Sequence, residues 1–93
     1  MKVRCTRLAR ADLENPQSYI AADKPAAARK VGARIRDAVR SLERHPQLGR
    51  PDTVPGTHEK LALPYPYAIV YEIAEDRDEI RILRIYHMAQ DRT

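Results

Sequence analysis

The sequence predicts an α+β domain in which a two-helix hairpin packs on one face of a mostly antiparallel, four-stranded sheet. One long segment has apolar residues at steps of three and four, which is typical of an amphipathic helix. Three short segments near the C-terminus, the last of them apolar on both faces, are separated by turn-like residues, which indicates successive strands. A short alternating segment precedes the helices. The predicted element order is therefore β-α-α-β-β-β.

The first two predicted elements are a short strand and a helix. Residues 2–8, KVRCTRL, alternate in polarity and predict a strand with a thin apolar face. Residues 9–22 place apolar side chains at helical spacing, with Pro16 inside the segment. Proline removes a helical hydrogen bond, but here it follows Asn15, a favourable cap. We expect either a kink or a restart of the helix at this position.

The second predicted helix has the strongest pattern in the sequence. Pro25 marks its start and Pro46 ends it. Its apolar stripe consists of Ala28, Val31, Ile35, Val39 and Leu42. The opposite side carries a basic row formed by Arg29, Arg36, Arg40 and Arg44. Such a row is often only a solvated helix face, but it also suits an acidic partner.

The C-terminal half predicts a loop and three strands. Residues 46–57, PQLGRPDTVPGT, are rich in proline and glycine and indicate a loop. The strands are expected at residues 58–63, 67–73 and 80–87, separated by turns. In the last strand, Ile80 and Ile82 are expected on one side and Leu83 and Ile85 on the other, which favours a central position. The second face of the sheet is then solvated, covered by a partner, or a site.

Composition limits the class of protein. A chain of 93 residues is expected to form one domain, residues 1–93, and its 17 basic against 13 acidic residues favour an acidic or polyanionic partner. The single cysteine forms no internal disulfide, and no export signal is recognised, which predicts a cytoplasmic protein. No apolar run approaches the roughly 20 residues that cross a bilayer. The histidines lack metal-ligand spacing and no glycine-rich phosphate loop occurs, so neither a metal nor a cofactor is expected.

Three stretches carry a resemblance to a known family. ARADLENPQSYIAADKPAAARKVGARIRDAVRSLERHPQLGRP, GTHEKLALPYPYAIVYEI and IRILRIYHMAQDR follow one another along the chain. In order and spacing they resemble the RelE/ParE toxin superfamily, closer to its ParE-like branch. The resemblance implies the toxin of a type II toxin-antitoxin system, neutralised by a ParD-like antitoxin in a hetero-oligomer. We expect the antitoxin to contact the basic row at Arg29, Arg36 and Arg40.

The superfamily has two activities that need different residues. RelE-like members are mRNA endoribonucleases, acting on the ribosome or alone, and metal-free cleavage requires a base, an acid and a cation. ParE-like members block DNA gyrase. The ribonuclease branch commonly carries arginine three places before the strand tyrosine, where this sequence has Ala68. A methyl group cannot pair with a phosphate. The sequence therefore favours a gyrase inhibitor that arrests growth, with an mRNA endoribonuclease or a non-toxic, antitoxin-binding member as alternatives.

Candidate residues follow from the resemblance. No catalytic residue is favoured, but a ribonuclease would use His87 as acid or base, Tyr86 for stacking or proton handling, and Arg84, Arg81 or Lys60 on phosphate. The alternative for His87 is a strand-end imidazole that is packed or hydrogen-bonded. His58 stands where ParE-like sequences often have arginine. The residues expected to contact the target are His58, Tyr86, His87 and Arg92.

Overall fold

The structure, a computed structural model, describes residues 1–14 and 24–88 and confirms the α+β class. Its elements are β1 (Lys2–Cys5), α1 (Arg7–Glu14), α2 (Pro25–Arg44), the 3-10 turn η2 (Pro46–Leu48), β2 (Arg50–Pro51), β3 (Thr57–Leu61), β4 (Tyr67–Ala74), the 3-10 turn η3 (Glu75–Arg77) and β5 (Glu79–His87). The bounds of α2, β3, β4 and β5 lie within two residues of the predicted ranges. Local periodicity was therefore sufficient to place these four elements.

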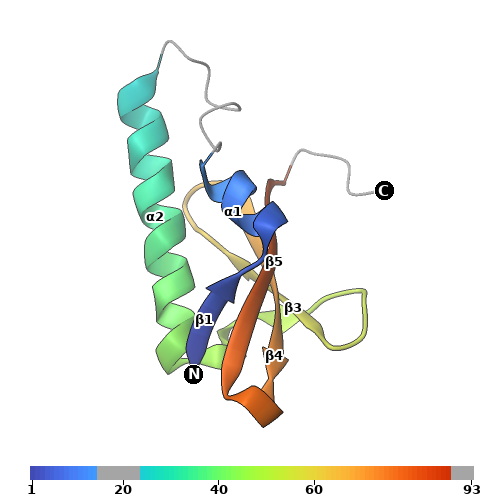
Figure 1. The fold of residues 1–93 in the computed structure, drawn as a ribbon. Coiled ribbons are helices and arrows are strands. Elements are labelled where there is room, and N and C mark those ends of the chain that lie inside the picture. The colour runs from blue at the N-terminus through green and yellow to red at the C-terminus, as the bar shows by residue number, and fades with distance from the viewer. Residues whose placement is uncertain (15–23, 89–93) are drawn as a thin grey trace.

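The strands form one sheet in the order β1-β5-β4-β3-β2. The β1–β5 pair is parallel and the other three pairs are antiparallel. In Figure 1 the long helix α2 runs beside the sheet and the short helix α1 lies near one end of β5. As predicted, β5 lies inside the sheet, between β1 and β4.

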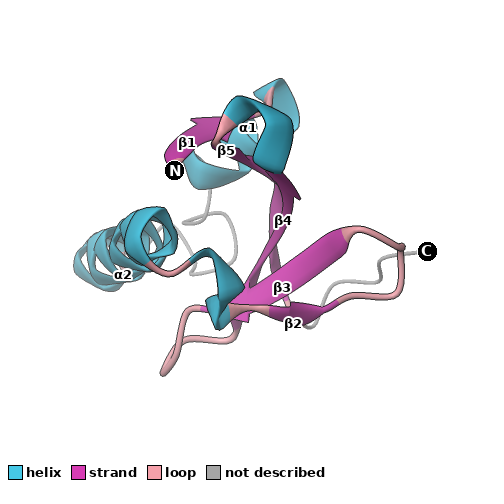
Figure 2. Ribbon diagram, turned by 90° about the horizontal axis from the view of Figure 1, so that it is seen from below, coloured by secondary structure: helices cyan, strands magenta, loops and turns pink. Residues whose placement is uncertain are grey.

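The core fills the space between α2 and the sheet, with Ala9 of α1 buried at its margin. Figure 2 shows α2 on one side of the strongly twisted sheet, with α1 beside β1 and β5. The buried core residues are Ala9, Val31, Ile35, Ala38, Leu42, Ala62, Tyr67, Ile69, Tyr71, Ile80, Ile82 and Ile85. Within the described part of the chain, neither helix has the length and apolar character of a membrane span.

The first helix begins earlier than the sequence predicted. Arg7 and Leu8 belong to α1, so the predicted strand over residues 2–8 is wrong at its end. Thr6 explains the change, because its Oγ accepts a hydrogen bond from the Ala9 N–H at 3.1 Å and caps the helix. The Thr6 hydroxyl also donates to the Leu83 carbonyl at 3.0 Å, which fixes the cap to β5. Pro16 and the predicted end of this helix lie outside the described residues.

The sheet has a fifth strand that the sequence did not predict. Within the predicted loop over residues 46–57, Arg50 pairs with Glu59 and Pro51 with His58. The two-residue strand β2 thus extends the sheet at its edge, where a proline is tolerated because its missing N–H faces no further strand. A pattern rich in proline and glycine conceals so short a strand.

A bulge in β5 reverses the side on which its residues point. Val70 pairs with Arg84 and Tyr71 with Ile82, so that Leu83 is the extra residue. Ile85 therefore joins Ile82 on the α2 side, where both are buried in the core. The prediction that Leu83 and Ile85 share the face opposite Ile80 and Ile82 is wrong, because strict alternation fails at a bulge.

Tyr71 ties the segment after α2 to the sheet. Its side chain is fully buried, and its hydroxyl donates to the Pro46 carbonyl at 2.7 Å. The same oxygen accepts a hydrogen bond from the Gly49 N–H at 2.9 Å. Burial raises the pKa of Tyr71, while the Gly49 hydrogen bond lowers it. The phenol therefore stays protonated at neutral pH and keeps both hydrogen bonds.

We predict that Gly49→Ala lowers the free energy of unfolding by about 2 kcal/mol, a cost typical of overpacking. A Cβ at Gly49 would lie 2.5 Å from the Tyr71 Oη and 2.9 Å from the Glu59 carbonyl oxygen. Urea unfolding followed by circular dichroism measures the change.

Gly32→Ala is the matched control. A Cβ at Gly32 meets the Nη1 atom of Arg36 at 3.2 Å, the end of a flexible side chain. Since alanine favours a helix over glycine by about 1 kcal/mol, this variant should be neutral or more stable. Equal losses in both variants would contradict the close approach at Gly49.

Candidate functional site

The sheet has an open face, the surface turned away from α2, on which long polar side chains gather. Cross-strand partners share a face, so the register assigns each side chain to one side. The open face carries Arg4, Arg50, Glu59, Leu61, Ala68, Val70, Glu72, Glu79, Arg81, Arg84 and Tyr86. The α2 side carries the core residues together with His58, Lys60 and His87.

A buried carboxylate lies on the open face. Glu59 is only 6% exposed, and its two oxygens have different partners. The Tyr86 hydroxyl donates to Oε2 at 2.8 Å, and the Arg50 guanidinium pairs with Oε1 at 3.1 Å. Ala68 pairs with Tyr86 in the register and is fully buried. Because Tyr86 on β5 must reach across β4 to Glu59 on β3, a small side chain at position 68 leaves room for its ring.

Glu59 was not recognised from the sequence. It occupies an alternate position of β3, where a glutamate usually faces solvent. Its partners are 9 and 27 residues away along the chain, at Arg50 and Tyr86. No local pattern joins these three residues. Only the register of the strands brings Glu59 together with Arg50 and Tyr86, and the sequence did not supply that register.

The other arginines of the open face are also paired. The Arg84 guanidinium binds both oxygens of Asp12, at 2.7 and 3.2 Å, and the Ile85 N–H donates to the same carboxylate at 2.9 Å. The Arg81 guanidinium lies 3.1 Å from Glu72 and 3.9 Å from Glu79. Asp12 therefore neutralises Arg84, one of the cations that a ribonuclease would direct at a phosphate, whereas Arg81 lies between two carboxylates.

The sheet separates the predicted ribonuclease residues. Tyr86, Arg84 and Arg81 lie on the open face, whereas Lys60 and His87 lie on the α2 side. His87 is half-buried and packs edge-on against Tyr67, with ring centroids 5.1 Å apart. The structure therefore does not bring the five residues together at one site.

The predicted target-binding residues are also divided. The His58 ring stacks on Tyr71 at a centroid distance of 5.4 Å on the α2 side. Its buried Nδ1 has no hydrogen-bond partner among the described residues. His87 lies on the same side as His58, but Tyr86 lies on the open face, and Arg92 is outside the described residues. Sequence order at the end of β5 was a poor guide because neighbours on a strand point to opposite faces.

The net charge of the protein resides on α2. This helix has six basic and two acidic residues, a net charge of +4, and the whole chain also has a net charge of +4. The remaining 11 basic and 11 acidic residues cancel. Arg29, Arg36 and Arg40 are exposed, and their spacing of seven and four residues places them on one side of α2. Arg40 also pairs with Asp37 at 2.6 Å.

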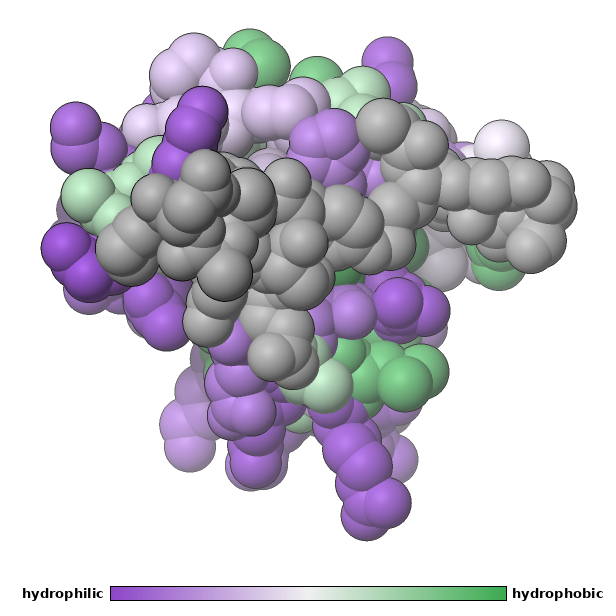
Figure 3. Space-filling model, turned by 90° about the horizontal axis from the view of Figure 1, so that it is seen from above, coloured by the Kyte–Doolittle hydropathy of each residue, from purple (hydrophilic) through white to green (hydrophobic). Residues whose placement is uncertain are grey.

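Apolar surface is scarce on the face seen from above in Figure 3. Hydrophilic side chains dominate its described surface, and the hydrophobic patches are small and separate. The described surface of this face is therefore mainly hydrophilic.

The described residues include no metal-binding group and one cysteine, Cys5. Among residues 1–14 and 24–88, no three His, Cys, Asp or Glu side chains are grouped to hold a metal ion. Burial raises the pKa of the Cys5 thiol, while the nearby Arg10 lowers it. The thiol is therefore protonated at neutral pH and is a weak nucleophile.

The chain is similar over most of its length to known proteins. Residues 3–92 match the profile of the ParE toxin of type II toxin-antitoxin system, parDE. The chain is 37% identical over 89 residues to Y4kP of Sinorhizobium fredii, which is named as a toxin, covering 96% of this chain and 90% of that protein. It is 35% identical over 80 residues to the toxin RelE2 of Caulobacter vibrioides, covering 86% of each. A solved structure of the chromosomal ParDE TA system from P. aeruginosa has 30% identity and a TM-score of 0.81, covering 94% of this chain and 95% of that chain.

Proposed function

Because the chain belongs to the ParE toxin family of type II toxin-antitoxin systems, we propose that it arrests growth by binding DNA gyrase in the cytoplasm. The observation that carries this proposal is the division of the potential ribonuclease residues between the two faces of the sheet. Binding a protein target needs no common catalytic centre. The family membership supports a toxin, and the geometry favours inhibition over cleavage.

Metal-free RNA cleavage requires its catalytic groups to act at one place, so the separation of the potential ribonuclease residues on two faces of the sheet argues against it. A general base and a general acid must come within about 3 Å of the atoms between which they move protons. His87 and Tyr86 point to opposite faces of β5, so they cannot act together on one phosphodiester. Ala68 supplies no cation, and the guanidinium of Arg84 is held by Asp12. The fold of this toxin is therefore present without an assembled ribonuclease site.

The proposed neutralising partner is a ParD-like antitoxin that contacts α2. The exposed arginines Arg29, Arg36 and Arg40 attract an acidic segment, and α2 carries the whole net charge. A segment that becomes ordered on binding can follow such a helix over its length. We therefore expect a toxin-antitoxin hetero-oligomer in which the antitoxin covers these arginines.

We predict that the purified toxin at micromolar concentration abolishes DNA supercoiling by gyrase, and that a stoichiometric amount of antitoxin restores it. The physical reason is that the antitoxin, by binding the toxin, lowers the concentration of free toxin. Agarose-gel assays of relaxed plasmid measure the activity. Unimpaired supercoiling by a toxin whose circular dichroism shows a folded protein would contradict the proposal.

The likeness to RelE2 of Caulobacter vibrioides favours mRNA cleavage as the second candidate. Primer extension on cellular transcripts after induction separates the two functions. Cuts that disappear in His87→Ala would assign ribonuclease activity to that imidazole. Growth arrest without cuts would favour gyrase.

A further inference from the structure

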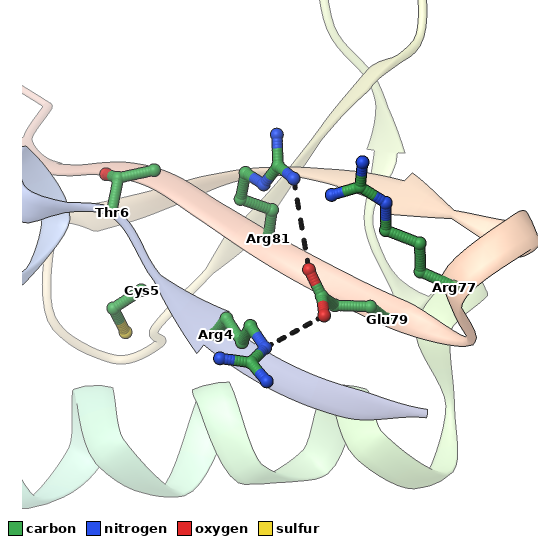
Figure 4. Close-up of a pocket in the computed structure, with 6 residues that line it drawn as sticks. All are labelled: Arg4, Cys5, Thr6, Arg77, Glu79 and Arg81. Atoms are coloured by element: carbon green, nitrogen blue, oxygen red, sulfur yellow. Dashed lines mark hydrogen bonds and ion pairs between the residues drawn. The ribbon is translucent and has the colours of Figure 1, made fainter.

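A pocket of about 390 Å³ lies where β1, η3 and β5 meet. Arg4, Cys5, Thr6, Arg77, Glu79 and Arg81 line it, and we call it the arginine pocket. Figure 4 shows Glu79 between Arg4 and Arg81, with Arg77 and Arg81 projecting on the same side of β5. Its volume is within the range of small-molecule sites, which is roughly 300–1,000 Å³.

The pocket has more positive than negative charge. Glu79 pairs with Arg4 at 2.8 Å and lies 3.9 Å from Arg81, which also binds Glu72 at 3.1 Å. Arg77 forms no ion pair with any described residue. Arg4 and Arg81 therefore share two carboxylates, of which only Glu79 lines the pocket, and Arg77 adds a third positive charge. Elsewhere on the open face, Arg50 and Arg84 each pair with a separate acidic residue, Glu59 and Asp12.

The strand register places two arginines side by side, and their electrostatic repulsion is only partly offset by Glu72 and Glu79. Arg4 and Arg81 are direct partners in the parallel β1–β5 pair, so their side chains leave the sheet side by side. Like charges at such positions destabilise a sheet. Local rules of stability are most often broken at functional sites. An anion in the arginine pocket would remove the repulsion.

We propose that the arginine pocket binds a phosphate group, carried by a nucleotide or by a nucleic-acid backbone. The three arginines come from three different elements, and Figure 4 shows the Arg77 and Arg81 guanidiniums on one side of Glu79 and the Arg4 guanidinium on its other side. A phosphate presents tetrahedrally arranged oxygens to such donors, whereas a carboxylate presents two oxygens in one plane. Guanidinium groups also bind phosphate in a bidentate manner. Arg77 provides donors that form no ion pair with a described residue.

The neighbourhood supports a ligand larger than a phosphate ion. A second pocket of about 460 Å³ shares Arg4 and Cys5 with the arginine pocket. Val3, Leu13 and Arg10 complete its lining. Its apolar side chains can contact a sugar. A guanidinium plane beside them can stack on a base, because guanidinium groups stack on aromatic rings. The proposal is independent of gyrase inhibition, since it concerns a different property of the chain.

The test compares phosphate with chloride on the full chain at equal ionic strength. Phosphate should raise the midpoint of thermal unfolding further than chloride, because it binds the folded state at a specific site. In Arg77→Gln the additional increase should be clearly smaller, because the site is weakened while the general stabilisation of folded proteins by phosphate remains. This residue is exposed and forms no ion pair with a described residue, so its replacement should leave the fold intact.

Two further ligands identify the source of the phosphate. Binding of ATP and of a short fluorescent single-stranded oligonucleotide is measured by calorimetry and by anisotropy. Arg77→Gln should weaken the preferred ligand about fivefold, as expected for an exposed ionic contact. Tighter binding of ATP assigns a nucleotide, and tighter binding of the oligonucleotide assigns a nucleic-acid backbone.

Arg44→Gln is the matched control, because it removes the same charge from an exposed arginine on α2. It should leave the phosphate effect unchanged. The proposal is overturned by equal effects of phosphate and chloride on the wild type, or by equal losses in Arg77→Gln and Arg44→Gln. Either result would show that phosphate is attracted by the overall positive charge of the protein and does not bind at the arginine pocket.

Discussion

Replacing Arg29, Arg36 and Arg40 together by glutamate is expected to weaken the antitoxin complex about a hundredfold or more. The substitutions turn the exposed side of α2 from basic to acidic, and like charges across an interface cost several kcal/mol. The three side chains are solvent-exposed, so the fold should persist. Calorimetric titration of the variant with antitoxin measures the affinity, and circular dichroism checks the fold.

The control variant has the same change in net charge, but its three substitutions lie outside α2. Lys2, Arg7 and Arg77 are exposed and lie outside α2, and glutamate at all three produces the same net charge. If α2 is the contact, this control should bind far more tightly than the α2 variant. Unchanged affinity of the α2 variant, or equal weakening of both, would show that the antitoxin does not depend on these arginines.

Replacing Ala68 by arginine, the residue common in the ribonuclease branch, is expected to lower the free energy of unfolding by about 3 kcal/mol or more. Ala68 is fully buried between β3 and β5. A long side chain there would displace Tyr86 from Glu59, leaving a buried carboxylate with one fewer hydrogen bond. Urea unfolding measures the loss, and restoring RNA cleavage is not expected.

Ala74→Arg provides the comparison for that loss. It lies on the same strand and face as Ala68 but is only half-buried and opposite Glu79. The new arginine can extend into solvent near a carboxylate, so stability should change little. A stable Ala68→Arg protein that cuts RNA would show that the open face accepts a ribonuclease site after one substitution.

The family match confirms the resemblance seen in the motifs, although the roles of single residues remain predictions. Ala68 illustrates the difference. The sequence identified it as a missing cation, and the structure adds that the small side chain accommodates Tyr86. The same residue therefore has a chemical consequence visible in the sequence and a packing role visible only in the fold.

The division of candidate residues between two faces also needed the structure. His87 and Tyr86 are neighbours in the chain, so sequence proximity suggested a common site. In a strand, neighbours point to opposite sides, and the bulge at Leu83 decides which side each takes. A bulge depends on the partner strand, so it leaves no reliable local signal.

The sequence by itself determined the class of the fold, the range of the long basic helix and the family. These properties depend on periodicity, composition and motif order, which are local or cumulative along the chain. Only the tertiary structure decided which charges meet, such as Asp12 with Arg84 and Glu59 with Tyr86, separated by 72 and 27 residues. Such contacts follow from strand register and helix placement, which are set by packing of the whole core.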